Sequence, residues 1–127
     1  MEVQKIGQFS LYHLRMEAGA DLFQGLRDFL QAEGLSHAFV LTCIGSCSRV
    51  VLAYPKTAEI PPEVERISLE GPFEINGISG DVKRVGSEIR VHLHGSVTKD
   101  GREVMGGAIG EGTEVFKMAE LLIVGVK

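Results

Sequence analysis

The hydrophobic and polar positions of the chain predict one helix near the N-terminus and a series of strands after it. Between Asp21 and Gly34, apolar residues recur at the spacing that gives a helix one apolar face. Asp21 is a favoured N-cap residue, and Gln24 completes a capping-box pattern with it. Gly34 suits the left-handed conformation that ends many helices. The sequence therefore predicts a single main helix over this segment.

The other patterned segments have the spacing of β-strands. Residues 1–17 are expected to be extended, with a half-buried strand over Phe9–Met16. The apolar run Ala38–Leu41 predicts a strand buried on both faces, which Gly45-Ser46 should interrupt before a second strand at Val50–Tyr54. The remaining expected segments are, in order, a loop over Pro55–Pro62, a bent strand over Phe73–Val85, a strand over Glu88–Thr98, a hairpin turn at Lys99-Asp100-Gly101, and strands over Arg102–Ile109 and Glu114–Val126.

One helix followed by several strands argues for an α+β fold with a mostly antiparallel sheet. The chain has 127 residues, the length of one domain, so residues 1–127 are expected to form a single domain. Hydrophobic residues make up 44% of the chain and charged residues 24%, which is typical of a soluble globular protein. This composition excludes a disordered tail and a collagen-like chain.

The charge of the chain limits the classes of partner that it is expected to bind. There are 13 Lys and Arg against 17 Asp and Glu, a net charge of −4. Binding of DNA through its phosphates requires a basic patch, and the longest basic feature here is Lys83-Arg84. The segment Met1–Lys5 lacks the pattern of a signal peptide, and no apolar stretch has the length of a membrane span. We therefore expect a cytoplasmic protein with no membrane partner and no direct contact with nucleic acid.

The sharpest candidate for chemistry is the sequence His92-Leu93-His94. Alternate residues of a strand project from the same face, so both rings can reach one metal ion. Zinc requires three or four such ligands, so the pair alone does not complete a site. The alternative interpretation is two polar residues on a solvated or interface face.

Two further features have a structural interpretation rather than a chemical one. Cys43 and Cys47 form a C-x3-C pair, and we expect buried free thiols that pack as small hydrophobic groups. The glycine-rich segment Gly106–Gly110 lacks both phosphate-loop fingerprints. It is expected to let the backbone approach another strand or subunit closely.

Several short motifs follow one another along the chain. They are Gly19-Ala20-Asp21-Leu22 at the start of the helix, Ile44-Gly45-Ser46, Gly71-Pro72-Phe73-Glu74-Ile75, Gly80, His92-Leu93-His94, Lys99-Asp100-Gly101, Gly106-Gly107, and Gly112 with Val115. In this order and spacing the sequence resembles the plants-and-prokaryotes-conserved (PPC) domain, from about Ser10 to Val124. The resemblance implies a strongly bent antiparallel sheet with one main helix packed on it, and assembly as a homotrimer. It marks Gly45, Ser46, Glu74, Gly106 and Gly107 as motif positions.

The resemblance also bears on the histidines. Many prokaryotic members of the family carry a third histidine after the double glycine, and it joins the other two in a metal site. Here that position is Ala108. Cys47 could take its place only if the segment around Gly45 reached the histidines.

The functional expectation is a homotrimeric interaction module with protein partners, a link to transcriptional regulation and no catalytic activity of its own. In plants the domain follows a DNA-binding AT-hook, whose core is absent here, and mediates self-association and contacts with transcription factors.

One alternative is a metal-dependent enzyme that holds zinc or another divalent ion loosely at His92 and His94. For this alternative, the sheet of the family is similar to that of acetolactate decarboxylase, and Glu74 would be an acid or base. The other alternative is a DNA-binding regulator, as prokaryotic members are often named. It requires a trimer that gathers basic residues on one face, namely Arg49, Lys83, Arg84 and Arg90.

Overall fold

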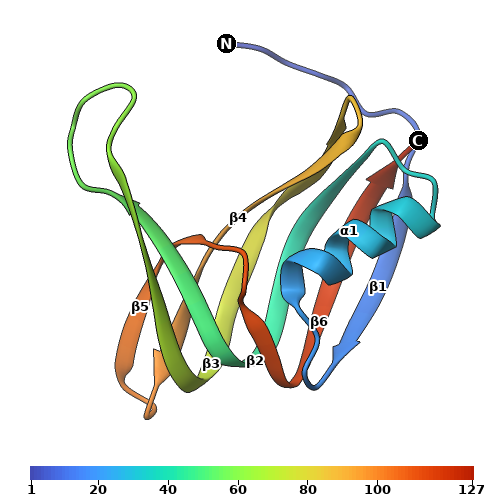
Figure 1. Cartoon of the computed structure of the whole chain (residues 1–127). Helices are drawn as coiled ribbons and strands as arrows, with labels where there is room; N and C mark the ends of the chain where they lie inside the picture. Colours follow the sequence, from blue (N-terminus) through green and yellow to red (C-terminus); the bar gives the residue numbers. More distant parts are fainter.

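Six antiparallel strands form one sheet, and a single helix covers one of its faces (Figure 1). The computed structural model describes all residues from 1 to 127. Its elements are β1 (Ser10–Glu17), α1 (Leu22–Ala32), β2 (His37–Pro55), β3 (Val64–Val85), β4 (Glu88–Lys99), β5 (Glu103–Ile109) and β6 (Glu114–Val126). The strands lie in the order β1-β6-β2-β3-β4-β5. The expected α+β fold is confirmed, although residues 1–9 form no strand and β3 begins at Val64, earlier than predicted.

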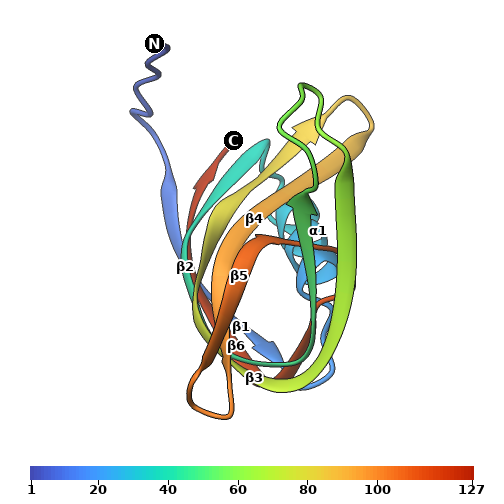
Figure 2. The ribbon, with the colours of Figure 1, turned by 90° about the vertical axis from the view of Figure 1, so that its left-hand side faces the viewer.

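The sheet is bent so strongly that β5 returns to a strand in its middle. β5 pairs with β4 along its length, and its end also pairs with β2, through Leu52 with Ile109 and Ala53 with Ala108. Figure 2 shows β2 to β5 curling round on one side of the molecule, while β1 and β6 lie beside α1 in Figure 1. A bulge in β3 between Ile75 and Gly77 and others in β2 add to this bending, because each bulge increases the local twist.

The strand β2 runs without a break from His37 to Pro55, so the predicted interruption at Gly45-Ser46 is wrong. Gly45 instead lies in a bulge of the ladder between β2 and β6, with φ 137°. A Cβ atom at this position would meet the backbone oxygen of Met118. Glycine is therefore needed for the close approach of two strands, a requirement that a sequence pattern does not distinguish from a chain break.

The prediction that Ala38–Leu41 is buried on both faces is also wrong. Ala38 and Val40 are fully buried, whereas Leu41 is 51% exposed. The reason is that α1 covers only one face of the sheet, and no element packs against the other face at this position.

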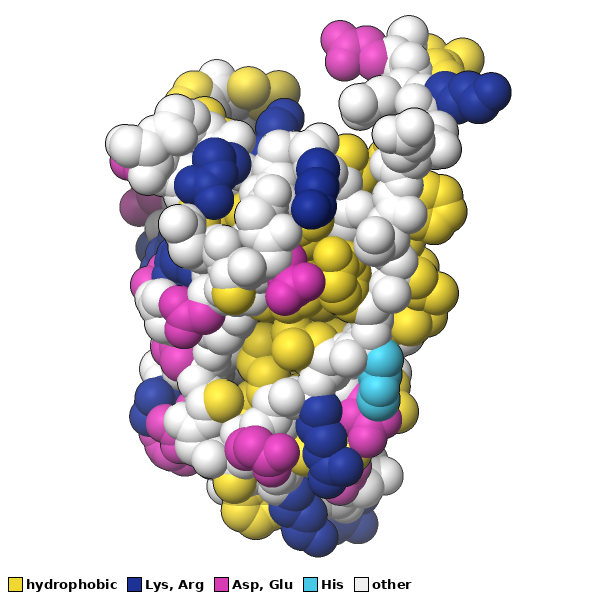
Figure 3. Space-filling view, turned by 90° about the vertical axis from the view of Figure 1, so that its right-hand side faces the viewer, with side chains coloured by type: hydrophobic (Ala, Val, Ile, Leu, Met, Phe, Trp, Pro, Cys, Tyr) yellow, Lys and Arg dark blue, Asp and Glu magenta, His cyan; other side chains and the backbone are white.

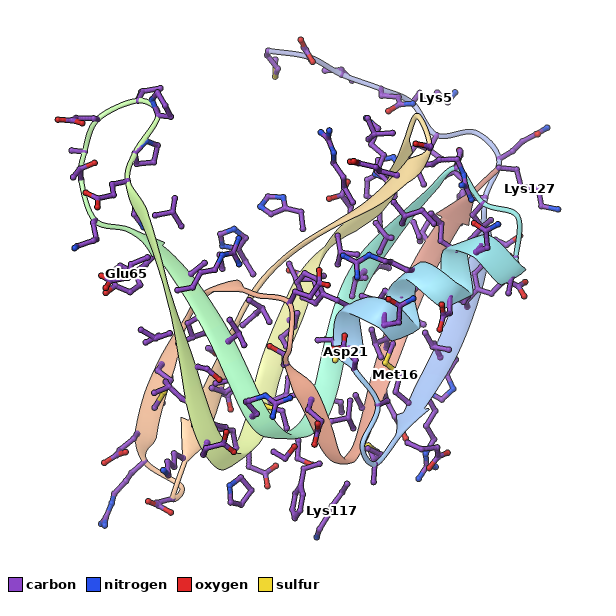
Figure 4. The ribbon with its side chains drawn as sticks, in the orientation of Figure 1. Lys5, Met16, Asp21, Glu65, Lys117 and Lys127 are labelled. Atoms are coloured by element: carbon purple, nitrogen blue, oxygen red, sulfur yellow. The ribbon has the colours of Figure 1, made fainter.

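The helix α1 begins and ends as its sequence predicts. The Asp21 carboxylate accepts a hydrogen bond of 2.9 Å from the backbone N–H of Gln24, and Gly34 adopts φ 63°. The Gln24 side chain donates to Asp28 instead of returning to the cap, so only half of the capping box forms. Figure 4 shows Met16 and Asp21 near the N-terminal end of the helix. With 11 residues, α1 is too short to cross a lipid bilayer, and no other helix is present.

The apolar side of α1 forms the centre of the core. Its buried side chains pack with those of the inner sheet face, which include Ala38, Val40, Cys43, Val82, Leu93, Leu121 and Ile123. On this face Tyr12 of β1 meets the Phe29 ring edge to face at 5.0 Å. We infer that the helix stays on the sheet mainly through these contacts, since burial of apolar area is the largest favourable term in folding.

Leu26→Ala should lower the free energy of unfolding by about 2–5 kcal/mol, because Leu26 is fully buried and its removal leaves a cavity. Urea unfolding followed by circular dichroism measures this change. Gln24→Ala on the exposed side of the same helix is the matched control and should change it by less than about 0.5 kcal/mol. Equal effects of the two substitutions would contradict the assigned helix faces.

Candidate functional site

His92 and His94 lie side by side on the exposed face of β4. The strand alternates, so Leu93 between them is buried in the core and both rings face outward, as the sequence pattern predicts. The Nε2 atoms of the two rings are 3.1 Å apart, and the rings meet at an interplanar angle of 85°. This geometry allows either a hydrogen bond between the rings or two bonds to one shared partner.

The geometry of the pair is compatible with two ligands of one metal ion. Two nitrogen ligands of one tetrahedral zinc ion lie roughly 3.3 Å apart when each is 2.0–2.1 Å from the metal, close to the observed separation. No cluster of three or more His, Cys, Asp and Glu side chains able to hold a metal occurs in the chain. Within one chain, the residues present therefore do not complete a zinc site.

The position at which the resemblance implies a third ligand, residue 108, is next to His94. Ala108 of β5 pairs directly with His94 on one side and with Ala53 of β2 on the other. Side chains of paired residues project from the same face, with Cβ atoms about 5 Å apart. A metal-binding side chain at residue 108 would thus lie beside His94, where the alanine methyl group offers no ligand.

A carboxylate near the pair was not found by sequence analysis. Asp81 of β3 lies directly opposite His92, and its Oδ2 atom is 2.6 Å from Nε2 of His37. The partners are 44 residues apart in sequence, so no short motif indicates them. Only the register of β2, β3 and β4 could have identified them. Asp81 is thus already engaged by a histidine on the same face.

The two residues considered as substitute ligands lie elsewhere. Cys47 is buried and pairs with Phe73 and Val115 in the ladders on either side of β2. Glu74 is exposed and lines a pocket of about 300 Å³, which contains neither His92 nor His94. Neither Cys47 nor Glu74 therefore completes the histidine pair.

The motif positions separate into two groups. Ser46 pairs with Glu74, lines the same small pocket and accepts a hydrogen bond of 3.0 Å from the backbone N–H of Lys117, at the lower end of the molecule in Figure 4. Gly106 and Gly107 lie on β5 instead, where a Cβ atom at Gly106 would meet the backbone oxygen of Gly95. The expected close approach of backbones at the glycine-rich segment is therefore confirmed within the chain.

The family model of the Plants and Prokaryotes Conserved (PCC) domain matches residues 3–127. The chain belongs to this family. The match confirms the resemblance to the plants-and-prokaryotes-conserved domain. The abbreviations PCC and PPC refer to the same domain, and PPC is used below. Two PPC-fold structures are particularly similar. A PPC protein from Pyrococcus horikoshii is 29% identical, with 98% of this chain and 85% of that chain covered and a TM-score of 0.81. A metal-containing protein from Archaeoglobus fulgidus is 28% identical, with 97% and 86% covered and a TM-score of 0.79.

Other relatives limit what the family match can show. Solved structures from Bacteroides thetaiotaomicron and Ralstonia eutropha that are described as DNA-binding proteins are 16% and 17% identical, and they share the fold alone. The bifunctional protein GlmU of a Synechococcus strain is 30% identical over 117 residues, which are 92% of this chain. The chain spans only 17% of that relative's length.

The cysteines of this PPC domain are free and buried, as the sequence predicts. Burial raises the pKa of the Cys43 thiol to about 12, with a further contribution from the nearby Cys47, and it raises the pKa of Cys47 to about 11. Both thiols are therefore protonated at neutral pH and are poor nucleophiles or metal ligands.

Alkylation by iodoacetamide should be at least roughly 100-fold slower in the folded protein than in guanidinium, because raised pKa values and burial both suppress the reactive thiolate. Mass spectrometry after a time course at about pH 8 counts the modified cysteines. Rapid modification of either residue in the folded protein would contradict their placement in the core.

Proposed function

We propose that this PPC domain is a homotrimeric interaction module with no catalytic activity of its own. The observation that supports the proposal best is an apolar surface on the face of the sheet that α1 leaves uncovered. The side chains of Leu11, Val124 and Phe39 form a row across β1, β6 and β2 through direct strand pairing. The outer apolar face consists of this row with Leu41, Ile44 and Leu122.

The exposure of this face is large for a protein that acts alone. Leu11 of β1 is 60% exposed, and Leu41 and Ile44 of β2 are each 51% exposed, with β6 between the two strands. Figure 3 shows hydrophobic side chains along the edge of the molecule below the N-terminal segment. Contiguous apolar patches on soluble proteins mark sites of association. A contact with another copy would remove this surface from water.

The relation to GlmU also supports an assembly role. The similar region makes up only 17% of that protein, so there it accompanies a much longer chain. A PPC domain that assembles with its own kind would bring such attached chains together. Other protein partners would reach the domain through surfaces outside the outer apolar face.

A second candidate function is loose binding of a divalent metal ion by His92 and His94. The separation of 3.1 Å between their Nε2 atoms favours it, and a relative with 28% identity is described as containing metal. The absence of a third ligand at Ala108 weighs against tight binding. A catalytic metal centre would need a further ligand from outside this chain.

Binding to DNA has less support. Arg49 is paired with Glu114 at 3.4 Å, and Arg90 lies 3.7 Å from Glu88, so two of the four basic residues considered for DNA contact have acidic neighbours. The net charge of −4 per chain is multiplied in an oligomer, and this repels phosphates.

The double variant Leu11→Asp/Leu41→Asp should convert the trimer into monomers, because assembly would then bury two carboxylates in an apolar contact. Analytical ultracentrifugation over a concentration range measures the mass. The matched control is Ile60→Asp, which adds a charge to an exposed loop and should leave the trimer intact. A wild-type monomer would refute the proposed function, and a trimeric double variant would refute the assigned interface.

Ala108→His should tighten zinc binding by at least about tenfold, because a third imidazole would then lie beside His94. Calorimetric titration of the wild type and the variant measures the dissociation constants. Ala18→His, which adds a histidine at an exposed turn, should bind as the wild type does. Equally tight binding by the wild type would mean that another group completes the site.

A further inference from the structure

A pocket with a volume of about 870 Å³ lies between α1, the edge of β4 and the turn that follows β5. This is in the range of small-molecule sites, roughly 300–1,000 Å³. Its apolar lining includes Phe23, Ile89, Val91, Leu93 and Ile109. The proposed assembly function gives this pocket no role.

Three arginines from three different elements line the pocket, although the chain as a whole is acidic. Arg27 of α1 is bound to Glu111, with Nη2 and Oε1 2.6 Å apart, and Arg90 of β4 lies 3.7 Å from Glu88. Arg66 of β3 has no ion pair and no hydrogen bond from its side chain. Arg66 is therefore available to a ligand, and Arg90, whose side chain is 68% exposed, has only this contact with an exposed carboxylate.

The turn after β5 holds these groups close to one another. A Cβ atom at Gly110 would lie 3.3 Å from Nη1 of Arg66, so the guanidinium group rests against the backbone beside Glu111. Arg27, through its hydrogen bond and charge, and Arg66, through its charge, lower the pKa of the Glu111 carboxyl group. The Glu111 carboxylate would thus compete with a bound anion for the guanidinium groups of Arg27 and Arg66.

The edge of β4 adds backbone donors to the pocket. The residues Glu88–His92 pair with β3 on one side, but β5 reaches only as far as Leu93 on the other. The Ile89 carbonyl on this open edge accepts a bond of 3.4 Å from Nε of Arg27. Because the N–H and C=O groups of a residue in an antiparallel ladder point to the same side, the N–H of Val91 also faces the pocket.

We propose that this pocket binds a small molecule through an oxyanion, a phosphate or a carboxylate group, held by Arg66 and Arg90 with the N–H of Val91. The planar guanidinium group suits both oxyanions because it donates two parallel hydrogen bonds. The apolar lining would receive the carbon skeleton of such a ligand. His92 lies on the same wall of the pocket.

Calorimetric titration with inorganic phosphate and, separately, with citrate tests the proposal at constant ionic strength. Saturable binding of at least one probe is expected, and the stronger of the two identifies the oxyanion. In ¹⁵N-labelled protein the same probe should shift the Val91 amide resonance. The absence of saturable binding by both probes would overturn the proposal.

Two substitutions should change the affinity in opposite directions. Arg66→Gln should weaken binding about tenfold, because it removes charge-assisted hydrogen bonds. Glu111→Gln should strengthen it, because the competing carboxylate is lost and Arg27 is released. Arg102→Gln, in the exposed turn between β4 and β5, is the matched control and should have no effect. If Arg66→Gln binds as well as this control does, Arg66 does not hold the ligand and the proposal is wrong.

Discussion

The pairing of the end of β5 with the middle strand β2 is the contact on which the candidate site depends. It places Ala53, Ala108 and His94 in one row across three strands. A shift of this register by one residue would turn Ala108 to the opposite face, since side chains alternate along a strand. The strong bend of the sheet therefore determines which residues can act together at the histidines.

The same bend explains why the two faces of the sheet differ. The inner face is covered by α1 and closes around the core, whereas the outer face of β1, β6 and β2 meets no other element of the chain. Successive side chains of a strand point to opposite faces of the sheet. When one set fills the core, the other set, which includes Leu11 and Leu41, is in contact with water. One short helix cannot cover both faces, so within a single chain the outer face stays exposed to water.

Local features of the structure could be predicted from the sequence, and contacts between distant segments could not. The caps of α1 and the two faces of β4 depend on residues a few positions apart, so the pattern of the chain predicts them. The continuity of β2 was missed because a glycine in a bulge and a glycine in a turn look alike in sequence. The pairs His37–Asp81 and Arg27–Glu111 join residues 44 and 84 positions apart. They arise only from strand register and from the docking of α1, which the motifs of the PPC family do not specify.

Ala108 bears on both ligands considered above, a metal ion at His92 and His94 and an oxyanion at Arg66 and Arg90. Its side chain lies beside His94 and also lines the pocket that contains Arg27, Arg66 and Arg90. A histidine there would supply a metal ligand and would occupy space that an anion needs, so a complete metal site and an open oxyanion pocket compete for one wall. With the small Ala53 and Ala108 side by side, this chain keeps that wall open next to Arg66, which has no partner. The departure from the family's histidine pattern thus favours a ligand held by arginine over a metal ion held by histidine.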